Sequence, residues 1–223
     1  PDDYVKTLGA DTVRTYLMFL GPWDQGGDWN DQGIKGMHRW FNRIWSAVLE
    51  KYEPTAVDDD KTRDLRRVTH QTIKRVHDDL ERFHFNTMLA ALMEFTNYLG
   101  KAREEKAVSI ESFAEATRTL MLLLAPTAPH IAEELWQRAG NPYSIHNQLF
   151  PQWDEKLAAE ENFTLVIQVN GKLRDKVDVP VNIAANEARE LVLGREKVKE
   201  HLKGATPVKV IYVPGKLINI VVK

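Results

Sequence analysis

Hydrophobic residues in the first 140 positions recur at spacings of three and four, which is the period of an amphipathic helix. The pattern is clearest where Ile34, Met37, Trp40 and Ile44 follow one another, and it predicts a long helix over about residues 30–52. The same reasoning predicts helices over residues 2–8, 11–20, 60–83, 86–100, 110–125 and 130–138. Consecutive amphipathic helices with short connections predict an antiparallel helical bundle.

Local signals place the ends of several of these helices. Asp11 stands where an N-cap accepts backbone N–H bonds for the second helix, and Asn86 has the same position in a helix that ends at Gly100. Pro126 ends the most apolar helix, because proline lacks the amide donor and clashes with the preceding turn. Thr127 is then expected to cap the helix that follows.

Strand sequence replaces the helical period after about residue 160. Two apolar, β-branched runs are each interrupted by a turn signal, at Asn170-Gly171 and at Pro214-Gly215, and each run predicts a β-hairpin. Residues 184–202, between the hairpins, have helix-forming sequence. The predicted fold is therefore mainly α, an antiparallel helical bundle followed by a small α+β domain with two β-hairpins. We expect the domain boundary near Glu160.

Charge is distributed unevenly between these two parts. The chain has a formal net charge of -2, but residues 162–223 contain 11 Lys or Arg against six Asp or Glu, whereas residues 1–161 contain 19 against 26. A basic tail on an acidic body indicates that the tail meets a polyanion, and that the body contacts it only through local stripes. An ordinary solvated surface is the alternative explanation for this charge pattern.

Two sets of cations are candidates for such contacts. In the tail, the candidates lie at or beside the two turns and are Lys172, Arg174, Lys176, Lys209 and Lys216. In the body, they lie on the polar sides of two predicted helices and are Arg39, Arg43, Arg63, Arg67 and Lys74. The tail lysines have a second interpretation, because cations also keep an edge strand from aggregating.

Patterns typical of catalysis do not occur. There is no GxGxxG, and Pro214-Gly215-Lys216 lacks the upstream glycine and the following Ser or Thr of a phosphate-binding loop. His130 precedes a glutamate pair, but no second histidine follows one turn later, as a zinc helix requires. With no cysteine in the chain, thiolate metal sites are excluded. We expect no catalytic residue, no metal site and no cofactor within this sequence.

The chain contains no run of about 20 apolar residues, so no membrane partner is expected. Its start has neither an initiator Met nor a signal pattern, which indicates a fragment of a longer protein. The absence of cysteine fits a reducing compartment, and we expect a cytoplasmic location.

Distinct motifs occur in the helical part at Pro1-Asp-Asp-Tyr, Arg39-Trp-Phe, Phe85-Asn86-Thr87 and Pro126-Thr-Ala-Pro129-His130. Two more occur in the tail, Gln168-Val-Asn170-Gly171-Lys172-Leu-Arg174 and Val210-Ile-Tyr-Val-Pro214-Gly215-Lys216. Together they resemble the bacterial-type leucyl-tRNA synthetases of class I, downstream of the KMSKS loop. The tail motifs are the discriminating ones, because the Phe85 and Pro126 motifs are shared with the isoleucyl, valyl and methionyl enzymes. The resemblance covers nearly the whole chain.

This resemblance implies a parent enzyme, a leucine–tRNA ligase, that uses ATP and Mg²⁺ and has catalytic and editing domains outside this fragment. It implies a stem-contact segment at residues 1–30, an anticodon-binding bundle at residues 31–159 and a tRNA-elbow domain at residues 160–223. The partner is then leucine tRNA, and the fragment alone is expected to be inactive. Two alternatives remain, a non-catalytic protein-interaction scaffold and the equivalent part of a valyl or isoleucyl enzyme.

Overall fold

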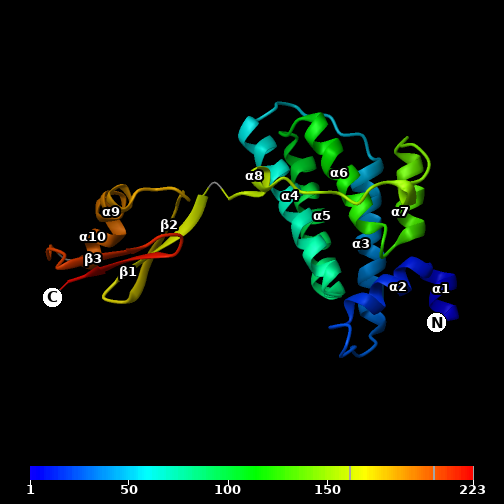
Figure 1. Cartoon of the computed structure of the whole chain (residues 1–223), viewed down its shortest axis with the longest axis horizontal. Coiled ribbons are helices and arrows are strands. Elements are labelled where there is room, and N and C mark those ends of the chain that lie inside the picture. The colour runs from blue at the N-terminus through cyan, green and yellow to red at the C-terminus, as the bar shows by residue number, and fades with distance from the viewer. Residues whose placement is uncertain (161, 203, 223) are drawn as a thin grey trace. The chain divides into compact units, whose positions relative to one another are not determined.

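The computed structural model describes residues 1–160, 162–202 and 204–222. The chain separates into two compact units, Pro1–Ala159 and Glu160–Lys223. The first unit is helical, and the second combines a four-stranded sheet with two helices (Figure 1). This confirms the predicted fold class, and residues 1–30 fold as part of the first unit. No helix within the described residues has the length and apolarity that crossing a membrane requires.

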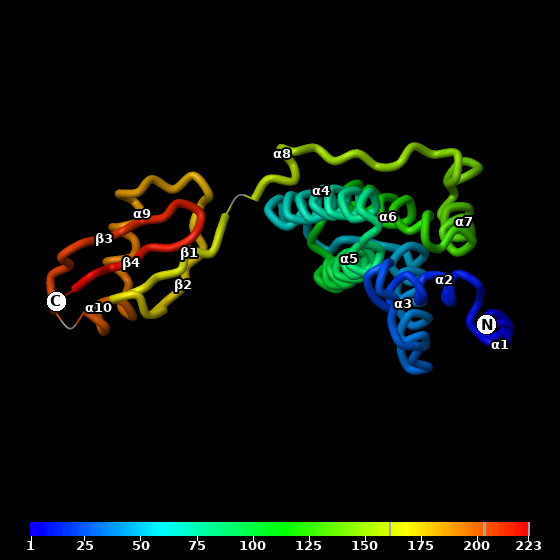
Figure 2. Tube along the Cα trace, turned by 60° about the horizontal axis from the view of Figure 1, so that its bottom comes forward, coloured from blue at the N-terminus to red at the C-terminus, as the bar shows by residue number. Residues whose placement is uncertain are grey.

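Helices of the first unit lie close to their predicted positions. They are α1 (Asp2–Leu8), α2 (Ala10–Phe19), α3 (Asp31–Leu49), α4 (Asp59–Glu81), α5 (Phe85–Glu105), α6 (Ile110–Leu124) and α7 (Pro129–Arg138), followed by η1 (Ile145–Asn147) and α8 (Glu155–Ala158). In the bundle, α4 packs against α5 and α6, and α3 packs against α5 and α7. Figure 2 shows α4, α5 and α6 side by side.

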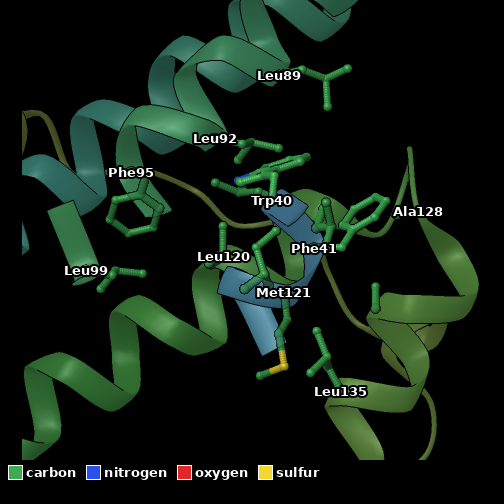
Figure 3. Close-up of a cluster of buried hydrophobic side chains, with 14 of the residues drawn as sticks. Trp40, Phe41, Leu89, Leu92, Phe95, Leu99, Leu120, Met121, Ala128 and Leu135 are labelled. Carbon is green, nitrogen blue, oxygen red and sulfur yellow. The ribbon is translucent and has the colours of Figure 1, made fainter. Parts of the chain in front are cut away.

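The core of this unit is built from the apolar sides of the helices. Trp40, Leu92, Phe95 and Leu120 gather at its centre, each at most 1% exposed (Figure 3). The indole N–H of Trp40 donates to the hydroxyl oxygen of Thr96 at 3.1 Å, so its one polar group is satisfied inside the core. The spacing that predicted the helices therefore selected the residues that hold them together.

Helix capping differs from the expectation at α2 and α7. Asp11 is not the N-cap of α2, because it lies within the first turn, where it is only 3% exposed. Its carboxylate instead accepts a hydrogen bond from the backbone N–H of Ile131, at 2.7 Å, and so caps α7 from another helix. Thr127 does not cap α7, since its hydroxyl donates to the carbonyl of Leu124. The sequence gives no local sign of a cap supplied 120 residues away.

The ends of α4 and α5 also differ from the prediction. Helix α5 begins at Phe85, with Asn86 inside its first turn, and it runs through Gly100 to Glu105. Charged residues 101–105 continue the helix because they are good helix formers and because Arg103 donates to the carbonyls of Ala47 and Glu50 at the end of α3. The helix predicted over residues 60–83 ends at Glu81, so Phe83 follows α4 and is 60% exposed.

The second unit contains both predicted hairpins. The first pairs β1 (Asn162–Val169) with β2 (Lys172–Pro180), and the second pairs β3 (Lys209–Val213) with β4 (Leu217–Val221). The strand order is β2-β1-β4-β3, with β1 parallel to β4. The single helix expected over residues 184–202 is instead two, α9 (Ala185–Gly194) and α10 (Glu196–Leu202), separated by extended backbone at Arg195.

Within the described residues of this unit, α9 and α10 cover one face of the sheet. Alternate residues of β1 and β4, including Leu165, Ile167 and Ile218, are buried against Val192 of α9 and Val198 of α10. Figure 1 shows both helices on the same side of the sheet. The other face presents the intervening residues to solvent, which include the partly exposed apolar side chains Leu173, Ile211 and Val213.

Candidate nucleic-acid interface

The first hairpin has a tightly fixed tip. Asn170 and Gly171 both have positive φ, 49° and 75°, as a two-residue hairpin turn requires. The side chain of Asn219 accepts from the N–H of Gly171 at 3.0 Å, and the side chain of Asn170 accepts from the N–H of Val222 at 2.9 Å. These two amide side chains join the turn to β4. Lys172, the first residue of β2, is therefore displayed from a rigid base.

All five candidate cations of the tail are exposed. They are Lys172, Arg174, Lys176, Lys209 and Lys216. Within residues 1–160, 162–202 and 204–222, no carboxylate lies within ion-pair distance of their head groups. By contrast, Arg195 and Lys199 of the same unit are paired, with Asp175 at 2.6 Å and with Glu196 at 2.8 Å. The predicted tail cations are thus available to an external anion.

Strand pairing divides these five cations between two ends of the sheet. Since β1 and β4 are parallel, the turn after β1 lies at the end of β4, whereas the turn before β4 lies beside Val166. Lys172 and Lys209 therefore belong to one end and Lys216 to the other. The five residues of β4 separate these two ends, a distance of about 16 Å. The two turns therefore lie at opposite ends of the sheet, and each presents its own cations.

A buried ion pair shapes the strand that carries three of these cations. The register of β1 and β2 shifts between Ile167 and Gln168, and Arg174 occupies the extra position on β2. Next to it, Asp175 is buried and accepts from Arg195 at 2.6 Å. The hydrogen bond from Arg195 is the main cause that holds the pKa of the Asp175 carboxyl below its ordinary value. The pair anchors the bulge to the start of α10.

The five candidate cations of the body separate into paired and unpaired residues. Arg63 contacts Asp60 at 2.5 Å, Arg67 contacts Asp64 at 2.9 Å, and Lys74 contacts Glu155 at 2.9 Å. The buried His70 ring, on the same line, accepts from the backbone N–H of Asp154 at 3.0 Å. Lys74 and His70 therefore hold the segment that includes α8 against the bundle, whereas Arg63 and Arg67 pair with carboxylates of α4 itself.

Arg39 and Arg43 of α3 are the unpaired residues. Both are exposed, and the described part of the chain places neither a hydrogen-bond acceptor nor a carboxylate on their guanidinium groups. Sequence reasoning missed their neighbours on α5, Asn97 and Lys101, which line the same groove as Arg43. No spacing within one helix could have found them, because the packing of α3 on α5 brings the two sets together.

Comparisons with known proteins agree with this picture of the chain. Residues 62–189 match the family described as the anticodon-binding domain of tRNA ligase. The whole chain is 56% identical to a leucine–tRNA ligase of Dehalococcoides mccartyi and 41% identical to one of Deinococcus radiodurans. Both matches cover 100% of this chain but only 27% of the length of either relative.

A solved structure matches the chain as well. LeuRS of Agrobacterium radiobacter K84, determined as a ternary complex with tRNA and LeuAMS, superposes with a TM-score of 0.82 at 33% sequence identity. The match covers 100% of this chain and 30% of that one. With its helical bundle, its two-hairpin unit and these relatives, the chain belongs to the family of anticodon-binding domains of tRNA ligases, and it is similar to one part of bacterial leucine–tRNA ligases.

Proposed function

We propose that this chain is the tRNA-binding portion of a leucine–tRNA ligase. It positions leucine tRNA for ATP-dependent aminoacylation by catalytic parts of the parent enzyme that lie outside this sequence. The observation that carries the proposal is the full-length match to leucine–tRNA ligases, of which this chain spans 27%. Under this proposal ATP, Mg²⁺ and the editing function belong to the rest of the parent, and the location is the cytoplasm.

Exposed cations on two rigid supports favour an RNA ligand. Proteins recognise structured RNA largely through its shape and its phosphates, which requires cations held in fixed positions. The fixed turn beside Lys172 and the helix that carries Arg39 and Arg43 both meet this requirement. The tail cations are assigned to the outer corner of the tRNA and the body cations to its stems.

The ten proposed contact residues differ in their expected contribution to RNA affinity, because some of them already pair with a carboxylate. Arg63, Arg67 and Lys74 must exchange a carboxylate partner for a phosphate, so the net gain from each contact is small. Arg39, Arg43 and the five tail cations give up only water. We therefore expect the second set to dominate affinity and its dependence on salt.

Filter binding of the full chain to leucine tRNA and to an unrelated tRNA, each at two salt concentrations, tests the proposal. We expect tighter binding of the leucine tRNA. The variants Lys172→Ala/Lys209→Ala and Lys176→Ala/Lys216→Ala should each reduce the slope of log affinity against log salt by about 0.7 to 0.9 per lost contact. The matched control is Lys199→Ala, which removes a cation of the same unit that is already paired with Glu196.

Each outcome of this assay has a distinct meaning. An unchanged slope and affinity in both double variants would show that the tail lysines serve another purpose, such as protection of the edge strands. No binding of any tRNA would instead favour a protein-interaction scaffold, for which the open sheet face with Leu173 and Ile211 supplies an apolar surface. If valine or isoleucine tRNA is used as the second tRNA, preference for it would assign the chain to one of those enzymes.

A further inference from the structure

A hollow of about 530 Å³ lies along α3, next to α5 and the end of α2. Its apolar lining comes from three helices, and two arginines of α3 stand at the hollow. The lining residues are Phe19, Gly33, Gly36, Met37, Arg39, Trp40, Arg43 and Met93. Met37 and Trp40 are among the most buried residues of the unit, so only their edges reach the hollow.

Two glycines, one turn apart on α3, keep the hollow open, and the fold explains only one of them. A Cβ at Gly33 would lie 2.4 Å from the hydroxyl oxygen of Tyr16, so the packing of α2 on α3 requires glycine there. At Gly36, the nearest atom to an added Cβ would be a guanidinium nitrogen of Arg39, at 3.7 Å. Glycine within a helix destabilises it relative to alanine. Packing therefore does not account for Gly36, whereas an occupant of the hollow does.

The two arginines beside the hollow form no ion pair within the described residues. Arg39 and Arg43 have no carboxylate partner among the described residues, and Arg43 also lines an adjoining groove of about 560 Å³ between α3 and α5. That groove contains Asn42, Asn97, Lys101 and one carboxylate, Glu104, which forms no ion pair with Arg43 in the described part of the chain. Arg103 lies in it too, but its guanidinium group is fixed by carbonyls at the end of α3. The arginines nearest the hollow are thus the ones left free.

We infer that this hollow binds one unstacked nucleobase of the tRNA, with Arg39 against the base and Arg43 on the adjoining phosphate. The inference rests on the proposed function and adds a specific subsite to it. Bases splayed out of structured RNA are bound by stacking on side-chain planes, including guanidinium groups, over an apolar floor. Arg suits the adjoining phosphate, because its planar fork donates two parallel hydrogen bonds.

Filling the hollow tests the inference without disturbing the core. In Gly36→Leu the new side chain occupies the hollow, whereas in Gly36→Ala the added methyl group should only narrow the hollow. Circular dichroism should show both variants folded, with Gly36→Ala at least as heat-resistant as the parent chain. The matched control is Gln32→Leu, which adds the same side chain at an exposed position of α3 outside the hollow.

For Gly36→Leu we expect leucine tRNA to bind about 5- to 150-fold more weakly, the range for loss of one stacked base. Its salt slope should stay unchanged, because no phosphate contact is removed. Arg43→Ala should instead lower that slope by about 0.7 to 0.9. Gln32→Leu should bind as the parent chain does. Dimethyl sulfate probing of the complex should reveal one base whose protection is lost in Gly36→Leu.

The results separate the two proposals. If the parent chain prefers leucine tRNA and Gly36→Leu binds it equally well with the same protection pattern, the base-binding hollow is refuted and the proposed function stands. A parent chain that binds no tRNA refutes both. If Gly36→Leu leaves tRNA binding intact but abolishes binding of an acidic peptide, the hollow belongs to a protein partner and the inference fails.

Discussion

The cap that Asp11 supplies to α7 predicts a large effect from a single exchange. Its carboxylate is 3% exposed, accepts from the N–H of Ile131 at 2.7 Å and lies 2.9 Å from Nδ1 of His130. In Asp11→Ala, an N–H in the first turn of α7 loses its charged partner in a partly buried setting. Loss of a cap costs about 1 kcal/mol, and loss of a hydrogen bond to a charged group costs about 1.5 to 3 kcal/mol. We therefore expect the free energy of unfolding to fall by about 2 to 3 kcal/mol.

Urea unfolding followed by tryptophan fluorescence measures the stability of the first unit, which contains Asp11. All six tryptophans precede residue 160, so the signal reports only on the first unit. Asp11→Asn keeps one carbonyl acceptor for Ile131 and should lose about 1 kcal/mol. Asp28→Ala, at an exposed loop position, is the control and should change stability by less than about 0.5 kcal/mol. A loss below about 0.5 kcal/mol in Asp11→Ala would refute the capping argument.

Three further perturbations test other parts of the structure. Because the folded-state pKa of Asp175 lies below its unfolded value, its contribution to stability is complete above the unfolded pKa and is lost as pH falls through the folded one. Asp175→Asn should therefore make the stability of the second unit less dependent on pH in the acid range. Amide exchange by NMR measures this, and an unchanged dependence of stability on pH would contradict it. Gly171→Ala places a Cβ at φ 75° and should destabilise the second unit by about 1 kcal/mol in the same measurement, whereas no loss would mean that the turn relaxes. Arg103→Ala frees carbonyls at the end of α3 and should lower the urea midpoint of the first unit, while Lys101→Ala beside it should not.

Local patterns predicted most of the secondary structure. Helix positions followed from apolar spacing, and both hairpins followed from β-branched runs around Asn170-Gly171 and Pro214-Gly215. The errors lie where a distant residue supplies the deciding contact. Helix α5 runs past Gly100 because its last turn is held by α3 and α4, through Arg103 and through the contact of Glu105 with Lys61 at 2.9 Å.

The candidate interface shows the same division. The sequence identified ten cations, and their helices or strands, from local polarity alone. It could not show that Lys74 pairs with Glu155, 81 positions away, or that Arg39 and Arg43 remain unpaired beside a hollow. Those facts depend on which surfaces the bundle brings together.

The sequence by itself therefore determined the elements, the two-part organisation and the concentration of positive charge in the tail. These properties depend on residues that are neighbours in the chain, so period, turn chemistry and composition report them directly. Tertiary structure alone decided that Asp11 caps α7, that the hairpin turns lie at opposite ends of the sheet and which arginines are free. The physical reason is that hydrogen bonds, strand register and ion pairs form between atoms that are close in space, whatever their separation in sequence.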